Sequence, residues 1–243
     1  MRILVACEES QRVTIELRNL GHEAYSCDIQ DCSGGFPEWH TKTDVTALLN
    51  GNCEFETCDG KKHVIDGRWD MIIAFPPCTH LACSGARHFE KKRADGRQRN
   101  AIEFFCRVLT ADCEKISVEN PVNIISGNYV RKWFPDLANK YNLPIKPTQE
   151  IQPYMFGDAY EKKTCLWLKG LHPLHSTNVV TPPKRTVFKS GKTMATWFAN
   201  SFGLPSEERS RVRSKTFAGI ARAMAEQWAG NNVRCVYVQG SLF

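Results

Sequence analysis

Cys78 is the residue of this chain with the strongest signal for covalent chemistry. It follows two prolines, Pro76 and Pro77, and precedes a segment rich in lysine and arginine. Proline restricts the backbone, which fixes the direction of the sulfur, and nearby cations favour the thiolate, which is the nucleophilic form. Because the chain has 11 cysteines and buried free cysteine is common, a packing role for Cys78 is the alternative.

Polar side chains also follow other short apolar runs. Glu8-Glu9-Ser10 comes after residues 3–7, Asp28 after residues 22–27, and Glu119-Asn120-Pro121 after residues 115–118. Doubly wound sheets bind ligands at the carboxyl ends of their parallel strands. We therefore expect Cys78 and Glu119 to share a pocket at that edge. The alternatives are a capping or ion-paired surface acid for Glu119 and a turn residue for Asp28.

The elements that must position these residues alternate between strands and helices. This alternation predicts an α/β fold with a doubly wound, mostly parallel sheet. We expect strands at 3–7, 22–27, 69–74, 115–118, 164–168 and 233–238, a hairpin over 53–65, a short helix opened by Asp44, and helices following Ser10 as N-cap, at 101–109 and at 214–228.

Two charged stretches have no clear periodicity. Residues 86–99 are expected to form an exposed, mobile loop. Residues 184–215 carry eight basic residues against two acids, interleaved with aromatic side chains, which suits a nucleic-acid backbone but is also typical of a solvated surface. Prolines cluster after about residue 145, so we expect a catalytic domain over 1–145 and 206–243 and a small recognition or insert region over 146–205.

The composition narrows the class of protein. The chain has 243 residues, a formal net charge of +6 and no apolar run of the length that a membrane span needs. We expect a soluble, cytoplasmic protein with reduced thiols, since the odd number of cysteines shows no regular framework. Cys53, Cys58 and His63 do not match a standard zinc spacing, so a hairpin is favoured there and no metal is predicted.

Several motifs resemble those of DNA cytosine C5-methyltransferases. Residues 76–85, Pro-Pro-Cys-Thr-His-Leu-Ala-Cys-Ser-Gly, resemble the nucleophile motif Pro-Cys-Gln-x-Phe-Ser-x-x-Gly, with Thr79 and Ala82 as departures. Residues 118–121 resemble the family's Glu-Asn-Val, and residues 216–221 resemble the C-terminal helix that closes the cofactor pocket. The family's Phe-x-Gly-x-Gly after the first strand is replaced by residues 7–11, Cys-Glu-Glu-Ser-Gln.

The resemblance covers residues 1–125 well and 210–230 moderately, and short members of this kind are typical of phage genomes. It implies a Rossmann-like, class I S-adenosylmethionine-dependent methyltransferase with Cys78 as nucleophile and Glu119 as its partner on the pyrimidine. The implied cofactor contacts are Cys7, Glu8, Glu9, Ser10, Asp28, Ile29, Asp44, Val45, Phe75 and Pro76. The implied contacts with cytosine-containing, duplex DNA are Pro77, Ser84, Gly85, Arg87, Asn120, Lys162, Lys163 and Lys192.

Two other functions stay open. A recognition region of this size also suits methylation of a free cytosine nucleotide such as dCMP. The altered first motif allows a non-catalytic DNA-binding module on the same fold, although such a module would need neither Cys78 nor Glu119.

Overall fold

The computed structural model describes residues 1–214 and 216–230 and shows an α/β fold built on a seven-stranded mixed sheet. Its strands, in the order in which they lie side by side, are β3 (His40–Lys42), β2 (Glu23–Asp28), β1 (Arg2–Ala6), β6 (Met71–Ala74), β7 (Ile116–Asn120), β9 (Thr164–Lys169) and β8 (Gln149–Ile151). The first five pair in parallel, whereas β9 runs antiparallel to both β7 and β8. The direction of winding changes between β1 and β6, as at the ligand-binding crevice of doubly wound sheets.

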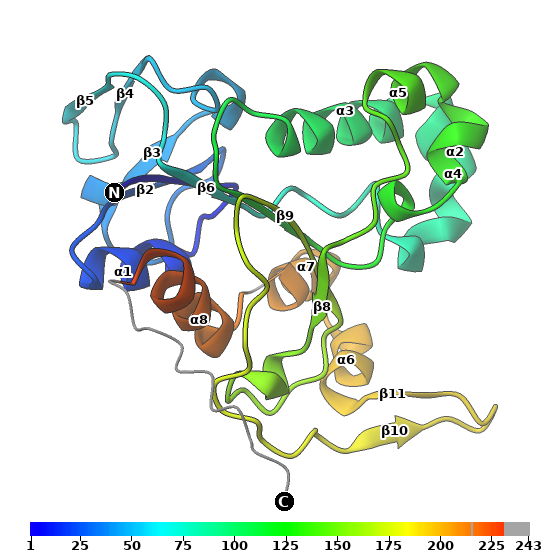
Figure 1. Cartoon of the computed structure of the whole chain (residues 1–243). Coiled ribbons are helices and arrows are strands. Elements are labelled where there is room, and N and C mark those ends of the chain that lie inside the picture. The colour runs from blue at the N-terminus through cyan, green and yellow to red at the C-terminus, as the bar shows by residue number, and fades with distance from the viewer. Residues whose placement is uncertain (215, 231–243) are drawn as a thin grey trace, which may run out of the picture.

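Helices cover both faces of this sheet (Figure 1). One layer holds α1 (Arg12–Asn19) and α8 (Ala218–Ala229), and the other holds α3 (Arg97–Leu109), α4 (Tyr129–Trp133) and α5 (Pro135–Lys140). Ile3 and Val5 pack in the first layer, while Leu4 and Ala6 pack in the second, because successive side chains of a strand point to opposite faces. Burial on both faces explains why β1 is continuously apolar.

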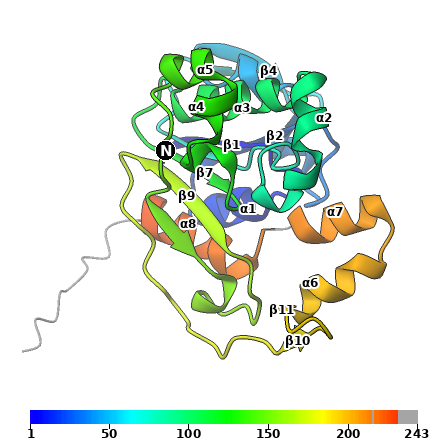
Figure 2. The same cartoon turned by 90° about the vertical axis from the view of Figure 1, so that its right-hand side faces the viewer.

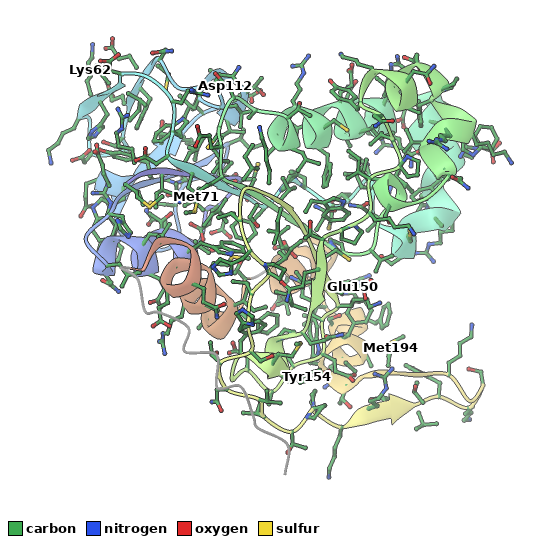
Figure 3. The ribbon with its side chains drawn as sticks, viewed as in Figure 1. Lys62, Met71, Asp112, Glu150, Tyr154 and Met194 are labelled. Carbon is green, nitrogen blue, oxygen red and sulfur yellow. The ribbon has the colours of Figure 1, made fainter. Side chains whose placement is uncertain are left out.

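Smaller elements surround this body. Two hairpins, β4 (Cys53–Glu56) with β5 (Lys62–Ile65) and β10 (Arg185–Val187) with β11 (Thr193–Ala195), stand outside the main sheet, as do α6 (Thr196–Asn200) and α7 (Ser206–Ser214). Figures 1 and 2 show β10, β11 and α6 lying away from the helical layer of α3–α5. Figure 3 shows the same separation between Met71 of the sheet and Met194 of the hairpin.

The domain boundary expected at residue 146 is corrected by the sheet. Strands β8 and β9 lie within the expected insert, yet both pair into the main sheet. Trp167 of β9 is buried against Phe105 of α3, with ring centroids 5.1 Å apart. Within the expected insert, it is therefore the chain after β9 that contributes no strand to the main sheet.

The expectation of a mobile loop over residues 86–99 is wrong. This segment forms a 3-10 turn, η3 (Cys83–His88), the helix α2 (Phe89–Ala94) and the first turn of α3, which begins at Arg97 and not at 101. Phe89, Lys92 and Gln98 are buried, so the high charge of the segment concealed a packed face. The last helix begins at Ala218, not at 214, and the expected strand 233–238 lies outside the described residues.

Candidate active site at the carboxyl edge of the sheet

Cys78 lies in a tight turn directly after β6. The backbone amides of Leu81 and Ala82 both donate hydrogen bonds to the carbonyl oxygen of Cys78, at 3.0 and 2.9 Å. The thiol is half-buried, so it is neither sealed in the apolar core nor fully exposed to water. This placement keeps the sulfur near the edge of the sheet where β6 ends.

The Cys78 turn is fastened to the end of β7, where Glu119 lies. Asn120 donates a side-chain hydrogen bond of 2.7 Å to the carbonyl oxygen of Pro76. Two backbone hydrogen bonds, from Cys83 to Val122 and from Ile124 to Leu81, join the same two loops. Cys78 and Glu119 are thus held near the ends of neighbouring strands, but Cys78 is not among the residues that line the pocket beside Glu119.

Asn120 itself does not lie where a direct contact with DNA was expected. Only 1% of its surface is exposed, and its oxygen accepts a hydrogen bond from Asn123 while its nitrogen bonds to Pro76. A buried amide with these partners positions the loop and does not face a ligand. The role expected for Asn120 is corrected accordingly.

Lys162 reaches the same site from the start of β9. Because β9 is antiparallel to β7, its first residues lie beside the last residues of β7, and Asn120 pairs with Cys165. A small pocket forms there, lined by Phe75, Glu119, Lys162, Thr164, Thr216 and Phe217. Its enclosed volume is about 10 Å³, room for about one water molecule, so a pyrimidine ring would enter only if the pocket walls move.

Groups around Glu119 and Cys78 act in opposite directions on the pKa values of these two side chains. Burial raises the pKa of the Glu119 carboxyl, and Lys162 and a hydrogen bond with Thr164 partly offset this rise. Burial and Glu119 raise the pKa of the Cys78 thiol, while Lys162 and Lys92 act to lower it. Burial therefore disfavours the charged form of both groups, while the lysines act in the opposite direction.

Lys163, the neighbour of Lys162, lies elsewhere. Its ammonium forms an ion pair of 2.5 Å with Glu150 of β8, and both side chains are about half exposed (Figure 3 labels Glu150). The two adjacent lysines therefore face different surroundings. Lys162 lines the pocket and Lys163 belongs to the outer surface of the sheet edge, which corrects the expectation that both serve the site.

The residues after β1 form the other half of this edge. Cys7 and Gln11 have φ angles of 58° and 55°, a conformation that glycine adopts most readily. The backbone therefore turns sharply here although the family's glycines are absent. Gln11 stabilises the turn, because its buried side chain exchanges two hydrogen bonds with the backbone of Phe36.

Glu8 caps the helix that follows this turn. Its carboxylate accepts hydrogen bonds from the backbone amides of Val13 and Thr14 and from the Thr14 hydroxyl, at 2.7, 3.2 and 2.7 Å. Burial raises the pKa of Glu8 to about 7. Ser10 was expected to be the N-cap and a cofactor contact, but the N-cap position is Gln11 and Glu8 supplies the capping oxygens. Glu8 itself is buried in this role and does not face the expected cofactor.

Asp28 and Asp44 lie close to Cys7 on this half. Both carboxylates, together with burial and Cys27, raise the pKa of the Cys7 thiol. Asp28 accepts a hydrogen bond of 2.9 Å from the backbone of Gln30, which orients its carboxylate, and the next residue, Ile29, is 73% exposed. Asp44 accepts one of 2.8 Å from the backbone of Thr46, at the start of η2 (Val45–Ala47).

These groups fit the chemistry of a nucleoside-bearing cofactor. A carboxylate at the end of a second parallel strand is suited to the hydroxyls of a ribose, and an exposed aliphatic side chain beside it is suited to a purine face. Asp28 and Ile29 supply these two groups. Val45 is buried beneath Asp44 and supports the turn instead of facing a ligand, which corrects its expected contact.

Comparisons with known proteins add no assignment. No protein-family model matches the chain, and no curated protein matches it. We therefore infer a function only from the arrangement of its own side chains.

The remaining predicted contacts are spread over two surfaces. Ser84, Gly85 and Arg87 belong to η3, next to the Cys78 turn, and Arg87 donates a hydrogen bond to His88. Lys192 lies at the far end of the β10–β11 hairpin, with exposed Phe188 and Val187. Figure 1 shows this hairpin at a distance from β6 and β7, so the structure does not bring Lys192 to the Cys78 site.

His63 shows why the cysteines and histidine near β5 are not grouped as metal ligands. One ring nitrogen of His63 bonds to the hydroxyl of Tyr25 at 2.9 Å and the other to that of Thr57 at 3.0 Å. Within residues 1–214 and 216–230, no group of three or more His, Cys, Asp or Glu side chains is placed to hold a metal ion. In the same ranges, no helix has the length and apolar character needed to cross a membrane.

Thr164 and Lys92 were not among the predicted contacts of this site, and Thr216 and Phe217 were singled out only as part of the segment 216–221 that resembles a helix closing a cofactor pocket. Thr164, Thr216 and Phe217 line the pocket, and Lys92 acts on Cys78 from α2. For Lys92 a signal was present, since Phe89 and Lys92 are three residues apart and share one face of a helical turn. Their burial reveals that face.

Proposed function

We propose that this chain is an S-adenosylmethionine-dependent cytosine C5-methyltransferase that acts on DNA. The observation that carries the proposal is that a half-buried thiol, Cys78, and a carboxyl with a raised pKa, Glu119, lie at neighbouring strand ends, with Lys162 beside them. The strand order supports a Rossmann-like, class I arrangement, since the parallel strands β3-β2-β1-β6-β7 follow the doubly wound order 3-2-1-4-5.

The chemistry requires both groups. Cytosine C5 is a poor nucleophile until the Cys78 sulfur adds to C6, which makes C5 enamine-like and moves negative charge toward N3. A protonated Glu119 donates a hydrogen bond to N3 and so stabilises that charge where it develops. S-adenosylmethionine, held by Asp28 and Ile29, would supply an electrophilic methyl group to C5, and its sulfur would leave as a neutral thioether. A base then removes the C5 proton, the C5–C6 double bond re-forms and the thiolate leaves.

The substrate is assigned to DNA from the surface of the segment between β9 and α8. The β10–β11 hairpin and its flanks carry Lys184, Arg185, Lys189 and Lys192, beside the exposed side chains of Val187 and Phe188. Clustered cations suit phosphates, and apolar or aromatic side chains among them suit bases. A free nucleotide would use neither feature at this distance from Cys78.

The test is methyl transfer from tritiated S-adenosylmethionine to duplex DNA, single-stranded DNA and dCMP in separate reactions. We expect label in duplex DNA, no turnover with Cys78→Ser, and cofactor binding retained by that variant in calorimetry. Cys83→Ser is the matched control, because Cys83 is exposed in the same loop and we expect it to retain activity.

Each other outcome has a defined meaning. Turnover retained by Cys78→Ser would refute the nucleophile assignment, and label in dCMP alone would move the substrate to the free nucleotide. No cofactor binding by the wild-type protein would favour a non-catalytic binding module. DNA containing 5-fluorocytosine gives a second readout. A base cannot remove the fluorine from C5 as it removes a proton, so the covalent adduct persists, and we expect peptide mapping to locate it at Cys78.

A further inference from the structure

Lys92 is a buried lysine whose charge the fold must accommodate. Only 8% of its surface is exposed, although lysine is almost never fully buried unless it is paired. It lies on α2, in the segment that follows the Cys78 turn, between the buried side chain of Phe89 and the start of α3. Placing an ammonium there is unfavourable without compensating partners, so the position needs an explanation.

The ammonium of Lys92 is bound inside the nucleophile loop. Its Nζ donates a hydrogen bond of 2.5 Å to the carbonyl oxygen of Thr79, the residue directly after Cys78. A Cβ placed on Gly85 would lie 3.4 Å from the same Nζ, so the ammonium also packs against the far end of this loop. The ring centroid of Phe89 is 5.9 Å away. Lys92 therefore connects both ends of the turn that carries the thiol.

The charged groups that face Cys78 come from three elements. Glu119 at the end of β7 raises the pKa of the thiol, whereas Lys162 before β9 and Lys92 of α2 act to lower it. Lys162 also acts on Glu119, while Lys92 is not among the groups that shift the Glu119 pKa. The two lysines are thus not equivalent, because Lys162 lowers the pKa of both Glu119 and Cys78, whereas Lys92 lowers that of Cys78.

Lys92 has its own charged surroundings. Burial and Arg97 lower the pKa of its ammonium, and Cys78 and Asp95 act in the opposite direction. A thiolate at Cys78 would give the ammonium an anionic partner in addition to the carbonyl oxygen of Thr79. Forming the thiolate would therefore satisfy both buried groups at once.

We propose that Lys92 is a positioning residue that fixes the Cys78 turn through Thr79 and supplies a dedicated positive charge to the Cys78 thiolate. Only the consequence of this inference for catalysis rests on the proposed function. The claim about the thiolate concerns Cys78 reactivity itself, so it can be tested without any methyl transfer.

The test is the rate of alkylation of Cys78 by iodoacetamide between pH 7 and pH 11.5, a range that extends above the raised pKa of the thiol, followed by peptide mapping. The variants are Lys92→Met, which removes donor and charge, and Lys92→Gln, which keeps a donor for Thr79 but removes the charge. We expect the pH midpoint to rise by about one unit in both, so that alkylation at pH 7.5 slows about 10-fold and recovers at high pH. Lys91→Met is the matched control, since Lys91 is exposed on the same helix and should leave the midpoint unchanged.

The outcomes separate this inference from the proposed function. A midpoint for Lys92→Gln equal to that of Lys91→Met would overturn the role of Lys92, whether or not the protein transfers methyl groups. If Lys92→Met fails to fold, Lys92→Gln and Lys92→Arg decide, and Lys92→Arg should restore the wild-type midpoint because it keeps the charge. A shifted midpoint in a protein that transfers no methyl group would leave the activated thiol in place and refute only the assigned reaction.

Discussion

Two half-buried cysteines stand at the same edge of the sheet, and their surroundings differ in charge. Cys7 follows β1, where burial, Asp28, Cys27 and Asp44 all raise the pKa of its thiol. Cys78 follows β6, where burial and Glu119 raise the pKa but Lys162 and Lys92 oppose them. Position at a strand end is therefore shared by both, and only Cys78 has nearby cations that favour its thiolate, the form that the proposed nucleophile needs.

The same contrast gives the two halves of this sheet edge different proposed binding partners. Carboxylates gather on the β1–β2 half, where a cationic sulfonium and ribose hydroxyls would be favourable partners. Lysines gather on the β6–β7–β9 half, where a thiolate and a polyanion would be favourable. Three substitutions test this division, in order of expected effect.

Replacement of Glu119 tests the half that holds the nucleophile and should have the largest effect. With Glu119→Gln we expect methyl transfer to fall about 100- to 1,000-fold, since the group that protonates or hydrogen-bonds the developing charge is lost. Alkylation of Cys78 should not slow, because Glu119 raises the pKa of that thiol. Steady-state kinetics and alkylation rates measure the two effects. Glu150→Gln is the control, and turnover within threefold of wild type for Glu119→Gln would contradict the assignment.

Replacement of Glu8 tests the acidic half through stability. The pKa of Glu8 is raised from 4.5 to about 7 in the folded protein, so the folded state binds the proton more tightly than the unfolded chain. This contribution to stability is present below pH 4.5 and is lost as the pH rises through 7. Relative to Glu8→Gln, which imitates the protonated acid, wild-type stability should fall by about 3 kcal/mol across that range.

Urea unfolding of both proteins at several pH values measures this difference. Glu54→Gln is the control, because Glu54 is an exposed carboxylate of β4 and should show a nearly constant difference from wild type. A difference between wild type and Glu8→Gln that does not change with pH would contradict the account of a buried, protonatable cap.

Replacement of Asp28 tests the proposed cofactor contact and should have the smallest effect. With Asp28→Asn we expect S-adenosylmethionine to bind about 10-fold more weakly in calorimetry, since one charge-assisted hydrogen bond to the ribose is weakened. Cys78 alkylation should be unchanged because Asp28 does not act on that thiol. Asp31→Asn is the control on the same loop. A changed rate of Cys78 alkylation together with unaltered cofactor binding would contradict the separate roles proposed for the two halves of the sheet edge.

Much of the framework could be predicted from local patterns. The strand before Cys78, the strand that ends near Glu119, the hairpin over residues 53–65 and the short helix opened by Asp44 were confirmed, although β7 extends through Glu119 to Asn120. Each depends on side-chain alternation or on a turn or capping residue acting within a few positions of the chain.

The errors have a common physical origin. Lys92 was taken for a solvated charge, Asn120 for a ligand contact, and Ser10 for a helix cap. For Ser10 the competing cap is the nearby Glu8, whereas for Lys92 and Asn120 the deciding partners are the backbone carbonyls of Thr79 and Pro76, which lie 13 and 44 residues away in the chain. Composition and spacing carry no information about such partners.

The sequence by itself determined which segments become buried strands, that Cys78 follows one of them and that Glu119 stands at the end of another, because a short apolar run is a local property of the chain. Only the tertiary structure decided which charges meet at the sheet edge. Antiparallel β9 brings Lys162 to Glu119, and the packing of α2 brings Lys92 to the Cys78 turn. Electrostatic interactions depend on distance in space and on burial, and neither quantity can be obtained from the order of residues along the chain.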